Sequence, residues 1–555
     1  MRDKKLGLIL GVLISLLATA GCSLPQDAAS AKADDLAFGP FTDFRTSVPE
    51  FGEELRLIRA TLSHNKVSFP GKTGTVSGFA AGSAYPQIWL RDAATIIPAS
   101  RFFYEKPFLQ SWLEEHLAFQ AEDGGLEDWF DSRGKFDKNT TETDQETSAV
   151  RAAAQITEII GPAWLEDKVK GETVLARLEK ALRFVLGHRF DRAHGLVTGA
   201  HTADWGDVDI GRGDQGAIYS GPETHWTCDI YDQSEFHGAA RGLAKMLATA
   251  NRGGESKFWE DQAALIRQNA DRWLWQADKG FYRVHLHLDS LRHPFDEDGM
   301  FALGGNTEAI LSGLALEDQS RRIIESALAR QKEFGISTIS GTLLPPYPKG
   351  VFKHPMMDDP YEYQNGGQWD WFGAKLVLAM FEHGFSRQAK EKLLEIARKN
   401  IANKGLYEWD TPAGQGRGSA FYSGSAGSLA RALFEGYYGI KIAGDAPSLA
   451  PRLNEDKATV HVYFPASGSF AAYDYQWDAK RRTVVFRFNS NISRAGTIEI
   501  SMPLFRPGNA AGESLQKVQV RKDGVKTAFQ TAVVGDDAFV VIRTDFNNHV
   551  LEVRF

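Results

Sequence analysis

Residues 202–209, TADWGDVD, place three carboxylates around one tryptophan in a short glycine-containing stretch. Carboxylates this close together oppose one another's ionisation, so one of them can stay protonated near neutral pH, as a general acid requires. Aspartate is also a common turn residue, so a calcium loop or a solvated turn is the alternative interpretation. The spacing therefore predicts an acid among Asp204, Asp207 and Asp209 without choosing between them.

A second carboxylate, Glu408, lies about 200 residues downstream in the aromatic segment 405–410, GLYEWD. An ionised carboxylate that faces a protonated one supplies the base of general acid–base chemistry. The alternative is a surface acid at the end of a helix. If the two segments act on one substrate, the fold must bring them together.

Helical periodicity dominates the chain up to about residue 440. Apolar residues at i, i+3, i+4 and i+7 predict about twelve helices. They begin near residues 49, 92, 107, 144, 173, 232, 256, 306, 320, 368, 387 and 423. Twelve helices in six hairpins suggest a toroid, in which an inner ring of six lines a funnel, with a superhelical helix-pair solenoid as the alternative. Long connections rich in glycine and tryptophan at 122–142, 195–230, 276–305 and 333–367 favour the toroid.

After Asp445 the pattern changes to alternation with a period of two. About seven short segments there are rich in β-branched and aromatic residues and are separated by turn residues such as Asp-Gly. They predict a β-sandwich of roughly 105 residues, expected to support one side of the helical part rather than to bind carbohydrate. The expected fold class is mainly α, a helical toroid followed by a small C-terminal β-sandwich.

The N-terminal residues explain one of the cysteines. Basic residues precede an apolar run at 6–18 and the sequence TAGC at 19–22, a pattern typical of a bacterial lipoprotein signal with Cys22 as the lipidated residue. A transmembrane anchor is the alternative, but roughly 13 apolar residues are too few for a hydrocarbon core that needs about 20. Residues 23–38 are small and polar, as in a tether. We expect a lipoprotein exported to the periplasm, outer membrane or cell surface that touches the membrane through its lipid only. The expected organisation is a signal peptide at 1–21, a tether at 22–40, a toroid at 41–443 and a β-sandwich at 444–555.

The composition of the 555 residues limits partners and cofactors. Lys and Arg total 63 against 71 Asp and Glu, a net charge of -8, which lacks the basic excess that a nucleic-acid backbone rewards. The two cysteines, Cys22 and Cys228, cannot form a disulfide framework or a four-cysteine zinc site. His285 and His287 alternate as they would on a strand, and we do not take them as a metal site. We expect no nucleic-acid partner, no metal and no cofactor.

Four short motifs resemble those of one glycosidase superfamily. ADWGD at 203–207 resembles the Ala-Asp-Trp-Asn-Asp stretch of cellobiose phosphorylases and is similar to the acid loop of amylo-1,6-glucosidases. YEWD at 407–410 resembles the base segment of trehalases and processing α-glucosidases, and YQNGGQW at 363–369 resembles a segment of the phosphorylases and of neutral invertases. WLRD at 89–92 resembles the Trp-x-Arg-Asp motif that binds the terminal sugar in many relatives. In this order the motifs resemble the six-hairpin glycosidases, which implies an (α/α)6 toroid over roughly residues 45 to 440.

The resemblance implies roles for individual residues. Asp207 would be the general acid that protonates the glycosidic oxygen, with Asp204 as the second choice. Glu408 would be the general base that activates water on the opposite face of the sugar, giving inversion at the anomeric carbon. Arg91 and Asp92 would bind sugar hydroxyls, with a helix N-cap as the alternative for Asp92. The other expected substrate contacts, by tryptophan stacking or by hydrogen bonds, are Trp89, Trp205, Gln364, Trp369 and Trp409.

Two departures from the family pattern bear on which bond is cleaved. Gln364 stands where the family usually has histidine, and Asp370 stands where proline is common. We expect an inverting glycoside hydrolase that acts on exported or extracellular oligosaccharides. A glycoside phosphorylase is the first alternative; it needs no base because phosphate is its nucleophile. A non-catalytic carbohydrate-binding lipoprotein and a toroidal polysaccharide lyase are the others.

Overall fold

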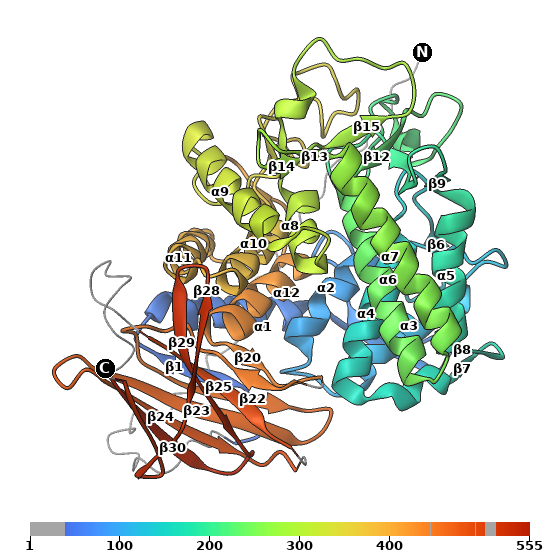
Figure 1. Cartoon of the computed structure of the whole chain (residues 1–555). Coiled ribbons are helices and arrows are strands. Elements are labelled where there is room, and N and C mark those ends of the chain that lie inside the picture. Colours follow the sequence, from blue (N-terminus) through green and yellow to red (C-terminus); the bar gives the residue numbers. More distant parts are fainter. Residues whose placement is uncertain (1–38, 445, 494–495, 505–517) are drawn as a thin grey trace, which may run out of the picture. The chain divides into compact units, whose positions relative to one another are not determined.

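Residues 39–444, 446–493, 496–504 and 518–555 are described by a computed structural model (Figure 1). Residues Ala37–Phe555 form one compact unit. The predicted signal peptide, Cys22 and nearly all of the predicted tether lie outside the described residues. Among the helices that are described, none combines the length and the apolar character that a membrane crossing needs.

Twelve α-helices occur in the described residues, and each coincides with a helix predicted from the periodicity. Their bounds are α1 Pro49–Asn65, α2 Leu90–Ser100, α3 Pro107–Phe119, α4 Asp144–Ile160, α5 Val174–His188, α6 Ile230–Thr249, α7 Gly253–Trp273, α8 Leu303–Ser312, α9 Glu317–Phe334, α10 Asp370–Glu382, α11 Ser386–Asn403 and α12 Ser423–Arg431. A π-helical turn, Ala432–Tyr437, extends α12.

The even-numbered helices form a closed inner ring. α2, α4, α6, α8, α10 and α12 contact one another in this order, and α12 contacts α2 (Figure 1). The odd-numbered helices cover this ring from outside; α7 packs on α6, α9 on α8 and α11 on α10. This is the arrangement of an (α/α)6 toroid. An open solenoid is ruled out because its first and last inner helices would not meet.

The sequence distinguishes inner from outer helices. On α10 the residues from Trp371 to Phe381 are buried on all sides except at Lys375. On α11 burial follows one stripe that includes Ala389, Leu393 and Ile396. A helix that is apolar all round belongs in the middle of a protein, and one with a single apolar stripe belongs at its surface.

The strands after α12 form two sheets. The seven-stranded sheet has the order β1 (Asp43–Thr46), β22 (Ala458–Phe464), β23 (Ser469–Asp478), β24 (Thr483–Ser490), β30 (His549–Arg554), β26 (Gln519–Lys522) and β27 (Val525–Lys526). The five-stranded sheet has the order β20 (Ile440–Lys441), β21 (Ser448–Leu449), β25 (Ile498–Pro503), β29 (Asp537–Thr544) and β28 (Gln530–Val534). The prediction of about seven strands was too low, because β20, β21, β27 and β28 are short or lack clear alternation. With 40% of the described residues helical and 24% in strands, the fold is mainly α only in a rough sense.

One strand of the larger sheet comes from the start of the described chain. β1 pairs antiparallel with β22, with Asp43 opposite His461. Phe44 on β1 packs against Phe434 and Tyr438 after α12, at ring-centroid distances of 5.0 and 4.3 Å. The sequence analysis missed β1 because a strand of four residues carries little periodicity. The predicted division at 443/444 remains a prediction.

Candidate active site

The predicted site residues lie where inner helices begin. Each inner helix is separated from the next by one outer helix, so the chain reverses twice and the inner helices point the same way. Arg91 is the second residue of α2, and Trp369 immediately precedes α10. Glu408 lies on β18 (Tyr407–Asp410), the first strand of the two-stranded sheet that precedes α12. Asp207 lies in the connection that leads to α6 through β12 (Trp226–Asp229). The toroid therefore brings four distant motifs to one end of its inner ring.

Arg91 is the centre of a charge network at this end. Its Nη1 donates to Glu142 Oε1 and Asp144 Oδ2, both at 2.9 Å, and to the carbonyl oxygen of Trp205 at 3.1 Å. Its Nη2 donates to Asp207 Oδ1 at 2.6 Å. Burial, together with the charges of Asp207 and Asp144, raises the pKa of Glu142 well above its ordinary value despite the opposing effect of Arg91. The raised pKa favours the protonated form of Glu142 over that of Asp207, and the Glu142 side chain hydrogen-bonds to Asp207.

Residues 202–209 are called the acid segment below. Of its three carboxylates, Asp207 is the one that reaches solvent, with 27% of its side chain exposed. Gln364 holds it at two points: its Nε2 donates to Asp207 Oδ2, and its Oε1 accepts from the Asp207 N–H, both at 3.2 Å. Burial alone would raise the pKa of Asp207, but Arg91 and the hydrogen bonds from Glu142 and Gln364 lower it below its ordinary value. The sequence predicted that one carboxyl group of segment 202–209 stays protonated without choosing which; the lowered pKa of Asp207 favours its ionised form, and its role as the acid stays a prediction.

Glu408 is buried and held by two donors. The Ser419 N–H donates to its Oε2 at 2.8 Å, and the Tyr85 hydroxyl lies 3.1 and 3.3 Å from its two oxygens. Gly418 (φ +67°) passes so close that a Cβ there would lie 2.4 Å from Glu408 Oε2, so this position needs glycine. Burial raises the pKa of Glu408 to about 7, and the charges of Asp92 and Asp207 add to this effect against the two hydrogen bonds.

Asp92 connects the two halves of the site. It lies in the first turn of α2, where Trp89 is the N-cap residue, so Asp92 is not the N-cap itself. Burial raises the pKa of Asp92 to about 6, and its side chain hydrogen-bonds to Tyr422. Its Oδ1 is buried and has no protein partner within the described residues. The charge of Asp92 acts on Glu408 while its neighbour Arg91 binds Asp207, so both carboxylates belong to one site.

Asp204 has a structural role instead of the predicted chemical one. Its Oδ2 accepts from the Gly304 N–H at 2.6 Å and its Oδ1 from the Gly305 N–H at 2.9 Å, which satisfies the start of α8. The side chain is buried, and burial raises its pKa to about 8. The backbone of Asp204 is left-handed (φ +57°). Asp204 is therefore removed as the second choice for the acid.

The tryptophans divide into two groups. Trp205 and Trp369 are 2% and 1% exposed, and their rings meet edge to face with centroids 4.6 Å apart. Both are core residues, so we withdraw the proposed stacking on a sugar for them. Trp89 and Trp409 are only partly buried and keep the predicted role. Trp89 adjoins Tyr85, the residue that bonds Glu408, with ring centroids 6.3 Å apart.

Sequence reasoning missed three residues of the site. Glu142 was not singled out; the sequence of residues 143–146 predicts a helix start, with a substrate contact as the alternative, and Asp144 does begin α4. Tyr85 lies in a connection without a recognisable motif. Their partners are 51, 53 and 323 residues away along the chain, so no local pattern could have indicated them.

A cavity away from these residues lies near the junction with the C-terminal sheets. It has a volume of about 370 Å³ and is lined by residues that include Arg101, Lys245 and Phe464, and by none of the predicted site residues. A smaller cavity of about 50 Å³ is lined by Arg91 and by charged residues of α4, α6, α8 and α10. A group of histidines with one glutamate could hold a metal ion and is treated below.

Comparison with known proteins supports the fold. No protein-family model matches the sequence, and no curated protein matches it. The α-L-rhamnosidase from Dictyoglumus thermophilum superposes with a TM-score of 0.61 at 13% identity, over 94% of this chain and 51% of that chain. The GH78 rhamnosidase of Bacillus sp. GL1 gives 0.58 at 15% identity, over 84% and 43%. The GH63 mannosylglycerate hydrolase from Thermus thermophilus gives 0.50 at 15% identity, over 67% and 98%.

These similarities concern the fold. The chain has the fold of glycoside hydrolases, and it spans about half the length of the rhamnosidases that it resembles. At 13 to 15% identity the shared architecture does not transfer a substrate. The function must be argued from the site.

Proposed function

We propose that the protein is an inverting glycoside hydrolase with Asp207 as general acid and Glu408 as general base. The observation that carries this proposal is the pairing of two unlike carboxylates at one end of a glycosidase fold. Asp207 is partly exposed and bound to Arg91, whereas Glu408 is buried with its pKa raised to about 7. A base whose pKa lies near the working pH is stronger than an ordinary glutamate and is still ionised in half of the molecules.

The acid step uses the proton of Glu142. Asp207 is ionised in the free protein, and Glu142 holds a proton hydrogen-bonded to it. We infer that this proton moves to Asp207 and from there to the glycosidic oxygen as the bond to the anomeric carbon breaks. The Arg91 guanidinium then stabilises the carboxylate charge left behind.

The base step takes place on the other face of the sugar. Ionised Glu408 removes one proton from a water molecule while the water oxygen bonds to the anomeric carbon. The products are a sugar of inverted configuration and an alcohol; Glu408 then loses the proton that it took from water, and Glu142 regains one from solvent. Room for the water requires the carboxyl groups of Asp207 and Glu408 to lie about 6.5 to 9.5 Å apart. The lipoprotein signal predicted from the sequence, with Cys22 as its lipidated residue, leads us to propose that this reaction takes place outside the cytoplasm on oligosaccharides.

Substitution of the two carboxylates tests the pair. We expect Asp207→Asn and Glu408→Gln each to lower hydrolysis of an oligosaccharide at least about a thousandfold without loss of folding, because the acid and base steps are coupled. The assay begins with a panel of α- and β-linked oligosaccharides and dinitrophenyl glycosides, with and without phosphate. Asp204→Asn is the matched control: it should lower the melting temperature and keep activity within about tenfold.

The leaving group separates the two roles. Dinitrophenolate leaves without a proton, so dinitrophenyl glycosides should restore much of the activity of Asp207→Asn and little of that of Glu408→Gln. Azide should restore the latter by replacing water. The opposite pattern would make Glu408 the acid and Asp207 the base.

Product stereochemistry tests inversion. Proton NMR in the first minutes should show the anomer opposite to that of the cleaved bond, at a rate independent of phosphate. Retention would mean that one carboxylate is a nucleophile. Product that appears only as a sugar 1-phosphate would establish the phosphorylase alternative, and no turnover of any panel member would favour a binding protein.

A further inference from the structure

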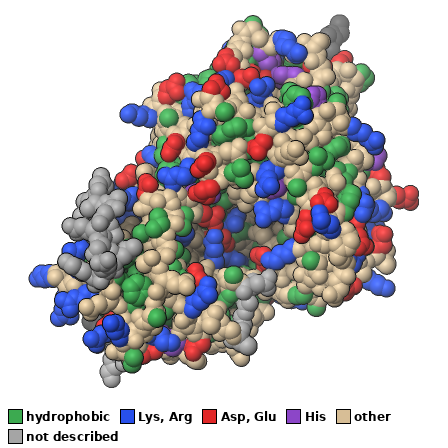
Figure 2. All heavy atoms as spheres, viewed as in Figure 1, with side chains coloured by type: hydrophobic (Ala, Val, Ile, Leu, Met, Phe, Trp, Pro, Cys, Tyr) green, Lys and Arg blue, Asp and Glu red, His purple; other side chains and the backbone are tan. Residues whose placement is uncertain are grey.

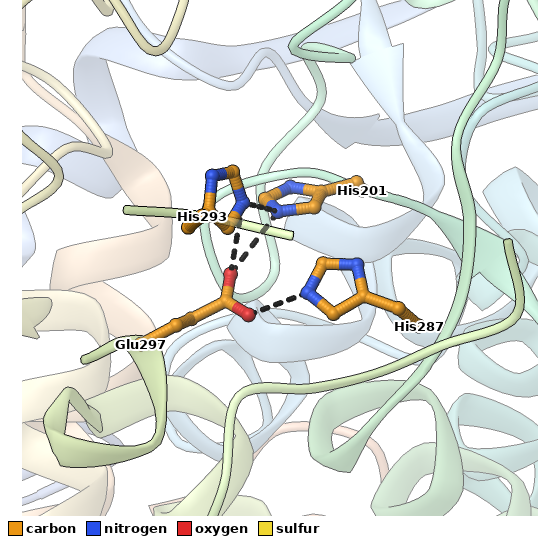
Figure 3. A group of neighbouring side chains, drawn as sticks. All are labelled: His201, His287, His293 and Glu297. Carbon is orange, nitrogen blue, oxygen red and sulfur yellow. Dashed lines mark hydrogen bonds and ion pairs between the residues drawn. The ribbon is translucent and has the colours of Figure 1, made fainter. Parts of the chain in front are cut away.

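Three histidines and one glutamate converge beside the acid segment. His201 lies just after β11 (Gly199–Ala200), His287 ends β15 (His285–His287), and His293 and Glu297 follow in the next connection (Figure 3). One ligand-type atom from each of the four side chains lies within 4.8 Å of the other three. They come from two chain segments about 90 residues apart, which explains why no local pattern indicated them as a group.

The separations of these atoms fit a tetrahedral ion. His201 Nε2 lies 2.9 Å from His293 Nε2 and 3.1 Å from Glu297 Oε1. Glu297 Oε2 lies 2.6 Å from His287 Nε2, and Glu297 Oε1 lies 3.6 Å from His293 Nε2. In a tetrahedral zinc site with bonds of about 2.0–2.1 Å, neighbouring ligand atoms stand roughly 3.3 Å apart. Without an ion, two ring nitrogens in direct contact can share only one proton between them.

The surroundings hold the carboxylate in place. The Tyr347 hydroxyl donates to Glu297 Oε1 at 2.6 Å, and His285 Nδ1 lies 3.3 Å from the same oxygen. Such contacts orient a ligand carboxylate before an ion binds. The four ligand side chains are between 0 and 13% exposed.

Access from solvent is short despite this burial. Figure 2 shows histidine side chains at the surface at the top of the view, in the region where Figure 1 labels β12 and β15. Imidazole nitrogens with one carboxylate suit zinc and related divalent ions, rather than calcium or magnesium, which prefer oxygen ligands.

We propose that His201, His287, His293 and Glu297 bind one divalent transition-metal ion of the zinc class, and that this ion fixes the acid segment. His201 precedes Asp204 by three residues and Asp207 by six. The other three ligands belong to the segment 287–297, so the ion joins the acid segment to a second part of the chain. With four protein ligands, none of them the proposed acid or base, its role is structural. This site revises the expectation of no metal at His287, and it stands independently of the proposed hydrolase activity.

The metal content of the whole protein tests the site. The full chain, purified without a histidine tag, should contain about one equivalent of zinc or a related ion by mass spectrometry. Removal by a chelator should lower the melting temperature, and Zn²⁺ should restore it. Co²⁺ added to the chelated protein should give the visible absorption bands of tetrahedral cobalt.

Variants assign the ion to these residues. His293→Ala and Glu297→Gln should each weaken Zn²⁺ binding at least about tenfold. His225→Ala is the matched control, because His225 lies nearby but pairs with Asp289 instead; it should keep the metal. Loss of the ion from His225→Ala, with retention in the other two, would place the site elsewhere.

Hydrogen exchange tests the effect on the acid segment without any activity assay. Exchange of residues 201–210 should slow when Zn²⁺ is added to the chelated protein, and exchange of residues 407–420 should stay unchanged. The proposal would be overturned if the purified protein held no stoichiometric metal and, in addition, the unsubstituted protein showed no thermal or spectroscopic response to Zn²⁺ or Co²⁺. An unchanged exchange rate at 201–210 with the metal bound would overturn the fixing role alone.

Discussion

A single guanidinium decides which carboxyl group of the site carries a proton. Arg91 faces Glu142, Asp144 and Asp207. Ionisation of all three carboxyl groups around a single buried cation is unfavourable, because like charges repel and burial removes the stabilisation by water. The raised pKa of Glu142 and the lowered pKa of Asp207 favour a proton on Glu142 and an ionised Asp207, which has the strongest contact with solvent. The group that holds the proton and the group that delivers it are therefore different residues.

Glu142→Gln tests this division of labour. Glutamine keeps the size and an N–H donor toward Asp207 but has no proton to release. We expect hydrolysis of oligosaccharides to fall roughly a hundredfold with unchanged folding, and hydrolysis of dinitrophenyl glycosides to fall much less. Glu158→Gln, near the C-terminal end of α4 and paired with Lys245, is the control and should match the unsubstituted protein. Equal losses on both substrate types would argue against a proton reserve.

The pH dependence should report Glu408. A base works only when ionised, so kcat/KM should fall as the pH drops below about 7, the pKa of Glu408. The Tyr85 hydroxyl bonds the ionised form and lowers this pKa, so Tyr85→Phe should raise it and move the acid limb up by as much as about one pH unit. Tyr219→Phe, whose hydroxyl donates to Asp137, should leave the profile in place. A limb that moves down, or not at all, would show that another group controls it.

Residue types and motifs predicted part of this site. They indicated Asp207, Glu408 and Arg91, which the structure brings to one end of the ring. They could not separate Asp204 from Asp207, because the choice depends on the start of α8, 100 residues farther along the chain. Which group holds a proton depends on burial and on neighbours in space, and neither can be read from spacing.

At the scale of elements, a buried ion cluster positions the strand that carries Glu408. The Lys399 ammonium on α11 lies 2.8 Å from Asp370 Oδ2, at the start of α10, and also binds Asp410 at the end of β18. The backbone of Gln368 exchanges two hydrogen bonds with Asp410, at 2.9 and 2.8 Å. Asp370, the residue that departs from the family pattern, thus belongs to the support of the base.

Lys399→Met should therefore be costly. Removal of the ammonium leaves two buried carboxylates with hydrogen-bond donors but without a cation, so we expect unfolding in urea to require about 3–5 kcal/mol less free energy. Lys392→Met on the same helix removes a more exposed pair with Glu395 and should cost less than about 1 kcal/mol. Similar losses for the two variants would mean that the cluster does not stabilise the fold.

Helices were easier to predict than sheets for a physical reason. An amphipathic helix of 9 to 21 residues repeats its pattern several times, and all twelve were recognised. Short strands such as β20 and β27 have two residues each and depend on partners far along the chain. Ring closure also had no local signal; it follows from the contact between α12 and α2.

At the scale of the whole molecule, the C-terminal sheets are not a simple appendage. β1, from the start of the described chain, is an edge strand of the larger sheet, and its Phe44 packs against the end of the helical ring. The two parts therefore share core side chains. We expect each to depend on the other for stability.

Phe44→Ala measures this dependence. Phe44 is 7% exposed, and removal of a buried phenylalanine ring costs about 3–5 kcal/mol. Phe41→Ala, three residues earlier and 45% exposed, should change the free energy of unfolding by less than about 0.5 kcal/mol. Calorimetry on both variants should show one transition that moves only for Phe44→Ala. A separate early transition for the sheets would contradict the shared core.

The closed ring also sets an order of events during synthesis. α2 ends at Ser100 and α12 begins at Ser423, so the 322 residues 101–422 must be made before the ring can close. β1 waits still longer, because its partner β22 ends at Phe464. Contacts over such long loops form slowly, and a growing chain without them exposes apolar helix faces to chaperones. A protein built in this way can complete its core only after nearly all of it has left the ribosome.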